Sequence, residues 1–466
     1  MFTKLCFVFL FLLPIEVMAI AAYPGAVGGG AASVGGRGGV VIQVTNLNDS
    51  GTGSFRACLE SAVQHRTCVF TVAGTIQMTS TVEIGTPYLT VAGQTAPGGG
   101  ILVSGVNRTY GNMFRIWTHD VIFQYIKMRN GYNNTCNTDI NSGCGIIATF
   151  DGATNVILDH LSSSWNINEN LGGWAFNPGM HDITYSYCLA AEGLTGHATE
   201  MLVGAGNPTN SADITNFDMH HNLFMNNSHR APLFKGKSSR IVNNIIYNQR
   251  NRCNQIRGQT STDIIGNLFR QGPGSGSFHE IQADNNADGT VIPGNPSIYA
   301  LGNKGWSQPI PANNQWVLTA QVGFENGPEN ASPAPSGWQR FTPLTNTAYP
   351  IVAESVASLE INLIPIVGDS RRLGCDGAWI ANRDTEDLKL INQYNTNTGN
   401  TATYDNESFY GGFPTIAAGT PCSDKDADGM PDVWEENHGY NPNNPANRNT
   451  VAPNGYTYLE NFLNGQ

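Results

Sequence analysis

Charged residues are scarce in this chain: Asp, Glu, Lys and Arg make up only 13% of its 466 residues. The formal net charge of −12 argues against a nucleic-acid partner, because nucleic-acid-binding proteins are usually basic. It still permits a polyanionic ligand, since a local basic cleft can form on an acidic protein. The cysteines lack the Cys-x-x-Cys spacing of zinc sites. Beyond the N-terminal segment no apolar run reaches the roughly 20 residues that cross a bilayer, so we expect no membrane partner.

The first 21 residues have the pattern of a secretory signal peptide. Lys4 precedes an apolar run over 5–15, and small residues follow at Ala19 and Ala21. The run is shorter than a membrane span, so we favour a cleaved signal over an anchor and expect a secreted protein. In a eukaryotic secretory pathway the Asn-x-Ser/Thr sequons would then predict a glycoprotein; they lie at Asn48, Asn107, Asn133, Asn226, Asn330 and Asn406.

Cys6 in this segment is one of nine cysteines, so its removal leaves eight. An even number in an oxidising compartment indicates disulfides. Cys188 and Cys253 either pair or remain buried thiols. Three further pairs are expected, namely Cys58–Cys68, Cys136–Cys144 and Cys375–Cys422.

A rhythm of short β-type segments runs through 22–420, broken by many of the 53 glycines and by recurrent Asn. Gaps of about 20–35 residues between the segments are typical of solenoid repeats. Each unit is too small to bury its own apolar face, so stacking is required. Asn at one repeated position suits a ladder of side-chain hydrogen bonds between coils. Strands are predicted at 40–45, 70–72, 89–92, 121–125, 155–158, 182–185, 216–219, 240–243, 263–266 and 297–299.

Two other β architectures fit less well. A sandwich needs closely spaced hairpins with Asn-Gly turns, which are rare here, and a propeller needs a regular repeat of about 40–50 residues. The sequence therefore predicts an all-β fold, a right-handed parallel β-helix. Ser54 begins a helix over 55–62 that covers one end of the stack. The stretch 302–421 is expected to form final coils and long loops folded back on the stack.

The tail, 421–466, opens with an EF-hand-like loop that matches D-x-D-x-D-G-x5-E in full. Gly429 permits the sharp turn, and the acidic side chains together with one backbone carbonyl supply oxygen ligands for Ca²⁺. The alternative is a solvated acidic loop. A structural Ca²⁺ site is predicted at Asp424, Asp426, Asp428, Met430, Asp432 and Glu435.

The stretch 216–244 places three basic residues, Arg230, Lys235 and Lys237, on a loop between two short strands. A cationic cluster on a rigid frame suits an anionic substrate.

Several segments carry a resemblance to a known family. They read AYPGAVGGGAASVGGRGGVVIQVTNLNDSGTGSFRACLE, TVAGQTAPGGGILVSG, NVILDHLSSSW, AAEGL with the following His197, NNSHRAPLFKGK and, in the tail, NGYTYLE. The chain resembles the secreted pectate lyases of polysaccharide lyase family one, in the fungal and bacterial group with an EF-hand-like tail. The resemblance covers most of 23–270 and 424–463. It implies a parallel β-helix that cleaves pectate, an acidic polysaccharide, by β-elimination.

In that reaction a base removes the proton at C5 of a uronate, and cations stabilise the charge that develops on its carboxylate. The resemblance implies that Arg230 is the base and that Lys235 binds the carboxylate. The alternative for Arg230 is an ion pair that fixes its loop. His197 and Lys237 are further candidate substrate-binding residues. A guanidinium stays protonated to about pH 12 or beyond, so its use as a base requires neighbouring cations or hydroxide acting through it.

The sequence departs from the family at the cleft Ca²⁺ site. Two family aspartates fall on Cys144 and Ile146, a later acidic pair falls on Asn168 and Glu169, and the usual Lys falls on Thr199. Glu169 is thus a possible remnant of that site. Hard-cation sites need several oxygen ligands, so catalytic Ca²⁺ is in doubt, although Asp139, Asp151 and Glu192 could partly substitute.

A metal site is another reading of four histidines, His160, His197, His220 and His221, and two tryptophans also have alternative roles. His220 and His221 are expected to face opposite sides of a strand and so to share no site. His160 is either catalytic or part of a structural stack. Trp165 and Trp174 either stack on sugars or pack beneath a long loop.

Three alternatives to a pectate lyase remain. A glycoside hydrolase needs two acids across the cleft, and no paired Asp motif lies on the central coils. A lyase for more neutral pectin and a non-catalytic glycan-binding β-helix are the others. A monomer is the expected state for a capped solenoid.

Overall fold

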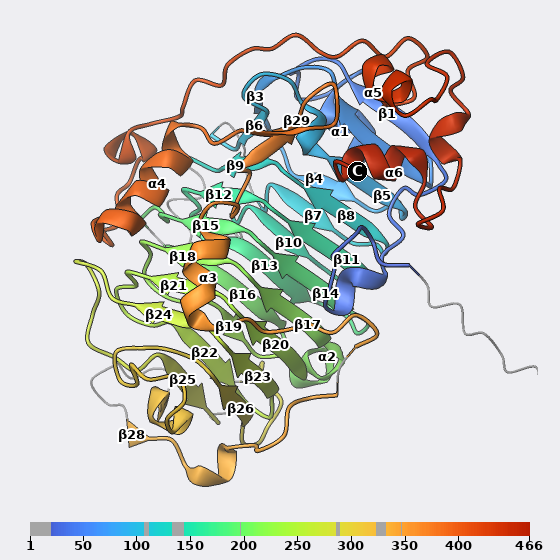
Figure 1. Cartoon of the computed structure of the whole chain (residues 1–466). Helices are drawn as coiled ribbons and strands as arrows, with labels where there is room; N and C mark the ends of the chain where they lie inside the picture. Colours follow the sequence, from blue (N-terminus) through green and yellow to red (C-terminus); the bar gives the residue numbers. More distant parts are fainter. Residues whose placement is uncertain are drawn as a thin grey trace, which may run out of the picture.

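The computed structural model describes residues 20–106, 111–132, 144–195, 197–285, 289–322, 332–345 and 347–466. Three long sheets wind together into a solenoid in which each complete coil contributes one strand to each sheet (Figure 1). The strands within each sheet pair in parallel, apart from the last pair of sheet C. The predicted parallel β-helix is confirmed. None of the described helices is long and apolar enough to span a bilayer.

Sheet A contains every strand that the sequence rhythm predicted. It consists of β1 (Val40–Val44), β2 (Arg66–Phe70), β5 (Leu89–Ala92), β8 (Val121–Gln124), β11 (Thr154–Asp159), β14 (His181–Ser186), β17 (Thr215–His220), β20 (Ser238–Val242), β23 (Ser261–Ile265) and β26 (Ser297–Leu301). The predicted strand at 70–72 overlaps β2 only at Phe70, where β2 ends, so its position is wrong.

Sheets B and C come from strands that the sequence did not reveal, most of them two to four residues long. Sheet B consists of β3 (Gly74–Gln77), β6 (Ile101–Ser104), β9 (Lys127–Arg129), β12 (Ser162–Ser164), β15 (Leu189–Ala191), β18 (Leu223–Met225), β21 (Ile245–Tyr247) and β24 (Leu268–Arg270). Sheet C consists of β4 (Val82–Ile84), β7 (Phe114–Ile116), β10 (Ile147–Thr149), β13 (Glu169–Ala175), β16 (Thr199–Ala205), β19 (Leu233–Phe234), β22 (Asn254–Arg257), β25 (Ile281–Asp284), β27 (Thr319–Gln321) and β28 (Ser332–Pro333).

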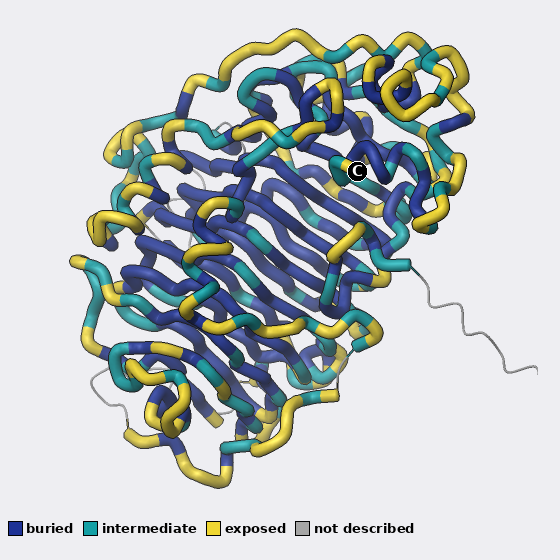
Figure 2. The backbone as a smooth tube through the Cα atoms, in the orientation of Figure 1, coloured by how far each residue is buried: buried dark blue, intermediate teal, exposed yellow. Residues whose placement is uncertain are grey.

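The interior of the solenoid is a stack of apolar side chains, and the strands that carry them are mostly buried (Figure 2). The register of sheet A produces this stack. Residues that are partners in successive strands all point inward and form one column of side chains. Burying each of these side chains contributes about 1.5–3 kcal/mol. The column runs through Val91, Phe123, Leu158, Tyr185, Met219, Ile241 and Ile264.

The predicted Asn ladder lies at the turn from sheet A to sheet B. The backbone N–H of Asn222 donates to Oδ1 of Asn244 at 3.0 Å, and that of Asn244 donates to Oδ1 of Asn267 at 2.8 Å. The ladder continues from the N–H of Asn267 to Oδ1 of Asn303 at 2.9 Å. These side chains satisfy buried turn amides that no strand can reach. In earlier coils the same inward position holds Ile126, Leu161 and Cys188.

One end of the stack is covered by helix α1 (Phe55–Leu59), which begins at the predicted cap and ends three residues early. Ser54 Oγ accepts the N–H of Ala57 at 3.1 Å. Phe55 packs against core rings, with 5.1 Å between its centroid and that of Phe70. The predicted Cys58–Cys68 disulfide ties α1 to β2.

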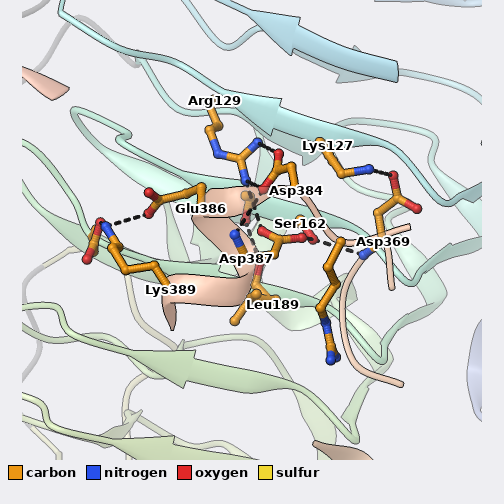
Figure 3. A network of polar contacts seen from close by, with 12 residues as sticks. Lys127, Arg129, Ser162, Leu189, Asp369, Asp384, Glu386, Asp387 and Lys389 are labelled. Atoms are coloured by element: carbon orange, nitrogen blue, oxygen red, sulfur yellow. Dashed lines mark hydrogen bonds and ion pairs between the residues drawn. The ribbon is translucent and has the colours of Figure 1, made fainter. Parts of the chain in front are cut away.

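After β28 the chain runs back along the solenoid, as the sequence indicated, but it also forms helices there (Figure 1). Helix α3 (Val356–Leu363) and helix α4 (Thr385–Thr396) pack apolar residues on the outer face of sheet B. Beneath them lies a network of buried ion pairs (Figure 3). Lys127 Nζ lies 2.6 Å from Asp369, and Arg129 lies 2.9 Å from both Asp384 and Asp387. This segment, 340–420, is called the C-terminal arm below.

The tail follows the arm and packs on the outer face of β1 and β5. Helices α5 (Asp432–Asn437) and α6 (Tyr458–Leu463) bury Trp434 and Phe462 there, against Val41 and Ala92. The Cys375–Cys422 disulfide joins the tail to the arm, as predicted. Smaller elements include helix α2 (Pro208–Asp213), strand β29 (Arg371–Leu373), strand β30 (Trp379–Ala381) and several short 3-10 helices.

Cys188 and Cys253 are buried thiols and do not form a disulfide. The Cys136–Cys144 pair includes a residue outside the described ranges, as do the sequons at Asn107, Asn133 and Asn330. Asn226 is only 2% exposed and its Nδ2 donates to Gln393 at 2.6 Å, so the folded protein hides that sequon from glycosylation.

Candidate functional site

Arg230 lies at the turn from sheet B to sheet C. The two strands predicted to flank it, β17 and β20, are a whole coil apart, because β18 and β19 come between them. The expected strand–loop–strand unit is therefore wrong, since its two strands are neighbours in sheet A and not parts of one hairpin. What positions Arg230 is the stack of neighbouring coils: its C=O accepts the N–H of Met201 in β16 at 2.8 Å.

Glu169, the first residue of β13, is the direct partner of Arg230. Its Oε1 accepts a hydrogen bond from Nη1 of Arg230, and both side chains are about nine-tenths buried, with 11% and 14% exposed. Register explains the meeting, because Glu169 pairs with Thr199 and Thr199 bridges to His229, next to Arg230. Burial raises the pKa of Glu169, and Arg230 opposes that rise. An ion pair thus holds the predicted base.

Lys235 follows β19 and lies across the outer face of sheet C. Its Nζ sits 4.9 Å from the ring centroid of Trp174 and donates to Oγ1 of Thr290 at 2.8 Å. Gly204, the register partner of Trp174, has no side chain and so leaves room for the side chain of Lys235 to pass over strand β16. A Cβ on Gly204 would lie 2.5 Å from Cε of Lys235. The charges of Arg230 and Lys235 both lower the pKa of Glu169, so the two cations lie on the same side of the molecule.

Two histidine rings lie beside Arg230, their centroids 5.7 Å apart. Burial and the charge of Arg230 lower the pKa of His197 to about 4. Burial and the same guanidinium hold the pKa of His229 well below its usual value. Both rings are therefore neutral around pH 7. His197 was expected near the cleft, whereas His229 was missed even though it precedes Arg230.

Arg250 and Arg252 are further basic residues that the sequence analysis missed. They occupy the same turn one coil later, where the N–H of Arg250 donates to the C=O of Asn227 at 2.9 Å. Burial, Arg257 and Arg230 lower the pKa of Arg252. The repeat spacing could have revealed Arg252. Strands β17 and β20, which occupy equivalent positions in successive coils, begin 23 residues apart, and Arg252 follows Arg230 by nearly that interval.

Other expected site residues lie elsewhere. Lys237 is exposed in the turn into β20 of sheet A, and among the described residues its side chain makes no contact with this group. Asp151 accepts hydrogen bonds from Asn177 at an exposed turn. Glu192 pairs with Lys389 of the arm at 2.9 Å. Neither acid joins Glu169: Asp151 lies at the turn from sheet C to sheet A, and Glu192, although it follows β15 of sheet B, is engaged by the arm. Asp139 is outside the described residues.

The predicted separation of His220 and His221 is also wrong. Their Nδ1 atoms lie 3.1 Å apart, because β17 ends at His220 and His221 takes a left-handed φ of 54°. Strand alternation therefore stops between them. Trp165 is fully buried and packs edge-on against Phe413 beneath the arm, which makes its role structural.

The acidic loop of the tail draws its carboxylates together. Asp424, Asp426 and Asp428 each offer an oxygen within 4.8 Å of the others, and Gly429 takes the turn with φ of 90°. Four buried oxygens have no hydrogen-bond partner among the described residues: both of Asp426, Oδ2 of Asp428 and Oε2 of Glu435. Burial and the neighbouring carboxylates raise the pKa of Asp428 to about 7.

Two of the six expected ligands behave differently. Asp432 Oδ1 accepts the N–H of Lys425 at 3.0 Å, and its Oδ2 bonds to Ser423, so this side chain fixes the loop to α5. The side chain of Met430 packs in the apolar core beside Trp434, which leaves its backbone carbonyl as the only possible ligand.

The chain is similar along its length to several fungal proteins. It is 31% identical over 455 residues to the probable pectate lyase C of Aspergillus terreus, with 96% of this chain and 94% of the relative covered. It is 30% identical over 457 residues to the protein of that name in Emericella nidulans, with 97% and 95% covered. No protein-family model matches the chain.

Solved structures share the fold. A pectate lyase bound to a hexasaccharide matches with a TM-score of 0.53 at 15% identity, covering 76% of this chain and 99% of that one. A polygalacturonate lyase fused with a self-assembling amphipathic peptide matches with a TM-score of 0.51 at 15% identity, covering 73% and 96%.

Proposed function

The chain belongs to the pectate lyase family, and on that premise we propose that it cleaves polygalacturonate at the basic group around Arg230. The enzyme is a polysaccharide lyase. The observation that supports the proposed site is that Arg230, paired with Glu169, precedes strand β19 and Lys235 directly follows it. Two cations fixed on one coil suit a substrate with a carboxylate on every sugar.

In the proposed reaction Arg230 accepts the C5 proton of a uronate, and the C5–H electron pair forms the C4–C5 double bond. The bond between C4 and the glycosidic oxygen breaks, and that oxygen leaves with the electron pair. Lys235 stabilises the charge that builds on the uronate carboxylate before the oxygen departs. His197, neutral above about pH 4, offers a hydrogen bond to a sugar hydroxyl.

A guanidinium stays protonated to about pH 12 or beyond, so Arg230 can accept the C5 proton only after hydroxide has removed one of its own. Glu169 forms an ion pair with the charged guanidinium. Substrate carboxylates compete with Glu169 for Arg230, so binding of the polymer would loosen that ion pair. We propose that hydroxide then acts through Arg230 as the base.

The surroundings of Arg230 do not fit a complete Ca²⁺ site. Of the acids considered as ligands, Asp151 and Glu192 are engaged elsewhere and Glu169 is engaged by Arg230. Ile146 is buried in the core and Cys144 is fully buried. Hard cations need several oxygen ligands, so no step of the reaction is assigned to a cleft metal.

The test is an assay with polygalacturonate that follows the ultraviolet absorbance of the unsaturated uronate. Wild type is expected to generate that absorbance, and Arg230→Ala to lose about 10²–10⁴-fold in rate, as for removal of a general base. Lys304→Ala, at an exposed lysine, is the matched control and should retain the rate. New reducing ends without the absorbance would indicate a hydrolase. Binding with neither signal would indicate a non-catalytic glycan-binding protein.

We further propose that the tail binds Ca²⁺ as a structural ion. The support is the set of buried, unpartnered oxygens on Asp426, Asp428 and Glu435, since buried carboxylates without partners are costly. Asp424 and the carbonyl of Met430 complete the donor set, and Asp432 orients the loop. A bound cation would hold Asp428 ionised.

Thermal unfolding tests this site independently of catalysis. Ca²⁺ at 100 times its dissociation constant should add about 2.7 kcal/mol to the free energy of unfolding, and a chelator should remove that gain. Asp428→Asn should abolish the Ca²⁺ response, whereas Asp213→Asn, at an exposed aspartate, should keep it. An equal response in both variants would overturn the site.

We also propose that residues 1–21 are removed during secretion. N-terminal sequencing of the mature protein tests this, with a first residue near Ala22 expected and an intact Met1 as the contrary result.

A further inference from the structure

A ladder of outward-facing rings runs along the turn from sheet A to sheet B, on the outside of the Asn ladder position. The ring centroids of Tyr125 and His160 lie 4.6 Å apart, and those of His160 and Tyr187 lie 4.8 Å apart, with planes within 17° and 6° of parallel. Each residue takes a left-handed φ between 52° and 53°, which turns its side chain away from the core. His160 thus belongs to a stack, one of its two expected roles.

A pocket of about 240 Å³ lies against this ladder. The N-terminal segment, including Tyr23 and Pro24, forms one wall, and Arg371 and Trp379 of the arm form another. Ligand pockets for drug-sized molecules measure about 300–1,000 Å³. This pocket is smaller, which suits a ligand the size of one sugar ring.

The pocket contains the guanidinium of Arg371, which neighbouring rings hold in place without an ion pair. Arg371 lies over the ring of Trp379 at 4.1 Å, and its Nε donates to Oη of Tyr125 at 3.1 Å. Among the described residues no carboxylate forms an ion pair with Arg371. Its remaining N–H groups therefore have the fork geometry that binds a carboxylate.

A second polar group in the pocket lacks a partner. Nδ1 of His160 lies 2.7 Å from Oδ2 of Asp159, but Nε2 is buried and has no hydrogen-bond partner in the described structure. His160 is only 6% exposed. The Asp159 carboxylate is fully used, since it also accepts from Ser186 and Gln124. An unpartnered buried polar atom costs free energy unless a ligand or water satisfies it.

We propose that this pocket is a binding site for a single sugar acid, separate from the cleft at Arg230. The rings of Tyr125 and Tyr187 stack on neighbouring rings and line the pocket, where they offer an apolar surface to a sugar. Arg371 pairs with the carboxylate of the sugar, and Nε2 of His160 bonds to a hydroxyl. The identity of that acid as galacturonate rests on the proposed function, but the pocket and its chemistry do not. The site lies at the corner of sheets A and B, whereas Arg230 lies at the turn into sheet C.

The experiment measures binding of galacturonate, with galactose as the neutral probe, to the full mature chain by calorimetry or ligand-observed NMR. Arg230→Ala serves as the background, because it removes the main cation of the cleft. Binding of galacturonate is expected to persist there and to weaken at least tenfold when Arg371→Gln is added. Trp379→Ala should weaken it also. Lys304→Ala is the matched control and should bind as the background does. Unchanged thermal midpoints identify variants that remain folded.

Three outcomes would overturn the proposal: equal binding of galacturonate and galactose, unchanged binding in the Arg371→Gln variant, or no binding to wild type. Each is independent of the lyase assay. A wild type that cleaves polygalacturonate but fails to bind galacturonate in the Arg230→Ala background would retain the proposed function and lose the pocket. A protein that binds there but does not cleave would do the reverse.

Discussion

Glu169 and Arg230 form an ion pair across the intervening strand β16, although 61 residues separate them in the sequence. The pair places an acid that opposes deprotonation directly on the residue proposed to take a proton.

The first prediction concerns the pH dependence of the reaction. A neighbouring carboxylate stabilises the charged guanidinium, so its removal in Glu169→Gln should make proton acceptance easier. Initial cleavage rates are expected to be higher in the variant than in wild type at pH values below the optimum. Initial rates from pH 6 to 11 measure this, with Asp213→Asn as the exposed control. A profile that stays in place would show that Arg230 acts as a fixed cation.

The second prediction uses two glycines of the same segment. A Cβ at Gly204 collides with Lys235, whereas a Cβ at Gly206 has nothing within 4 Å. Gly204→Ala should therefore displace Lys235 from Trp174 and raise KM for polygalacturonate about tenfold, roughly the loss of one charge-assisted contact of 1.5–3 kcal/mol. Gly206→Ala should leave KM unchanged. Similar kinetics in the two variants would remove Lys235 from substrate binding.

The third prediction concerns the Asn ladder. Asn244 accepts from the N–H of Asn222 and also donates from Nδ2 to the C=O of Met219 at 3.0 Å. Asn244→Ala leaves these buried groups unsatisfied, at about 1–3 kcal/mol each. Chemical denaturation should show a loss of several kcal/mol, against less than about 0.5 kcal/mol for Asn313→Ala at the surface. Near-equal losses would mean that water replaces the side chain.

The fourth prediction concerns a buried acid in sheet C. Glu200 is fully buried and accepts from Nδ2 of Asn170 at 3.0 Å and Nε2 of Gln249 at 3.3 Å. Burial raises its pKa to about 8. The folded state therefore keeps a proton that the unfolded state releases, so this stabilisation is complete below about pH 4.3. It is lost as the pH rises through about 8.

The measurement is the free energy of unfolding from pH 5 to 9 for wild type and Glu200→Gln. Wild type should lose up to about 1.4 kcal/mol per pH unit relative to the variant below pH 8. Above that pH the two curves should run parallel. Parallel curves over the whole range would show that Glu200 is ionised in the fold.

Much of the fold could be predicted from the sequence, because sheet A strands are long enough to show an apolar pattern. Strands such as β19, two residues long, carry no periodicity and become strands only because neighbouring coils offer hydrogen bonds. The arm helices were not predicted for another reason. Their apolar faces are complementary to the outer face of sheet B, and the sequence alone does not show that surface.

The candidate site divides in the same way. Arg230 and Lys235 were found through motif resemblance, and spacing alone would have added Arg252. The pairing with Glu169 was not predictable, because it depends on coils of unequal length coming into register. His220 and His221 show the limit directly, since one left-handed residue at a strand end overturned the alternation rule.

The sequence by itself determined that this chain winds into stacked coils, that asparagines line one inner corner and that the tail begins with an acidic loop. These features can be predicted because each signal, whether a repeat, a ladder residue or a loop motif, lies within a short stretch of sequence. Only the tertiary structure decided which charges meet, as with Glu169 at Arg230 and Lys127 at Asp369. Such contacts join segments tens or hundreds of residues apart, and packing alone sets the distance between them.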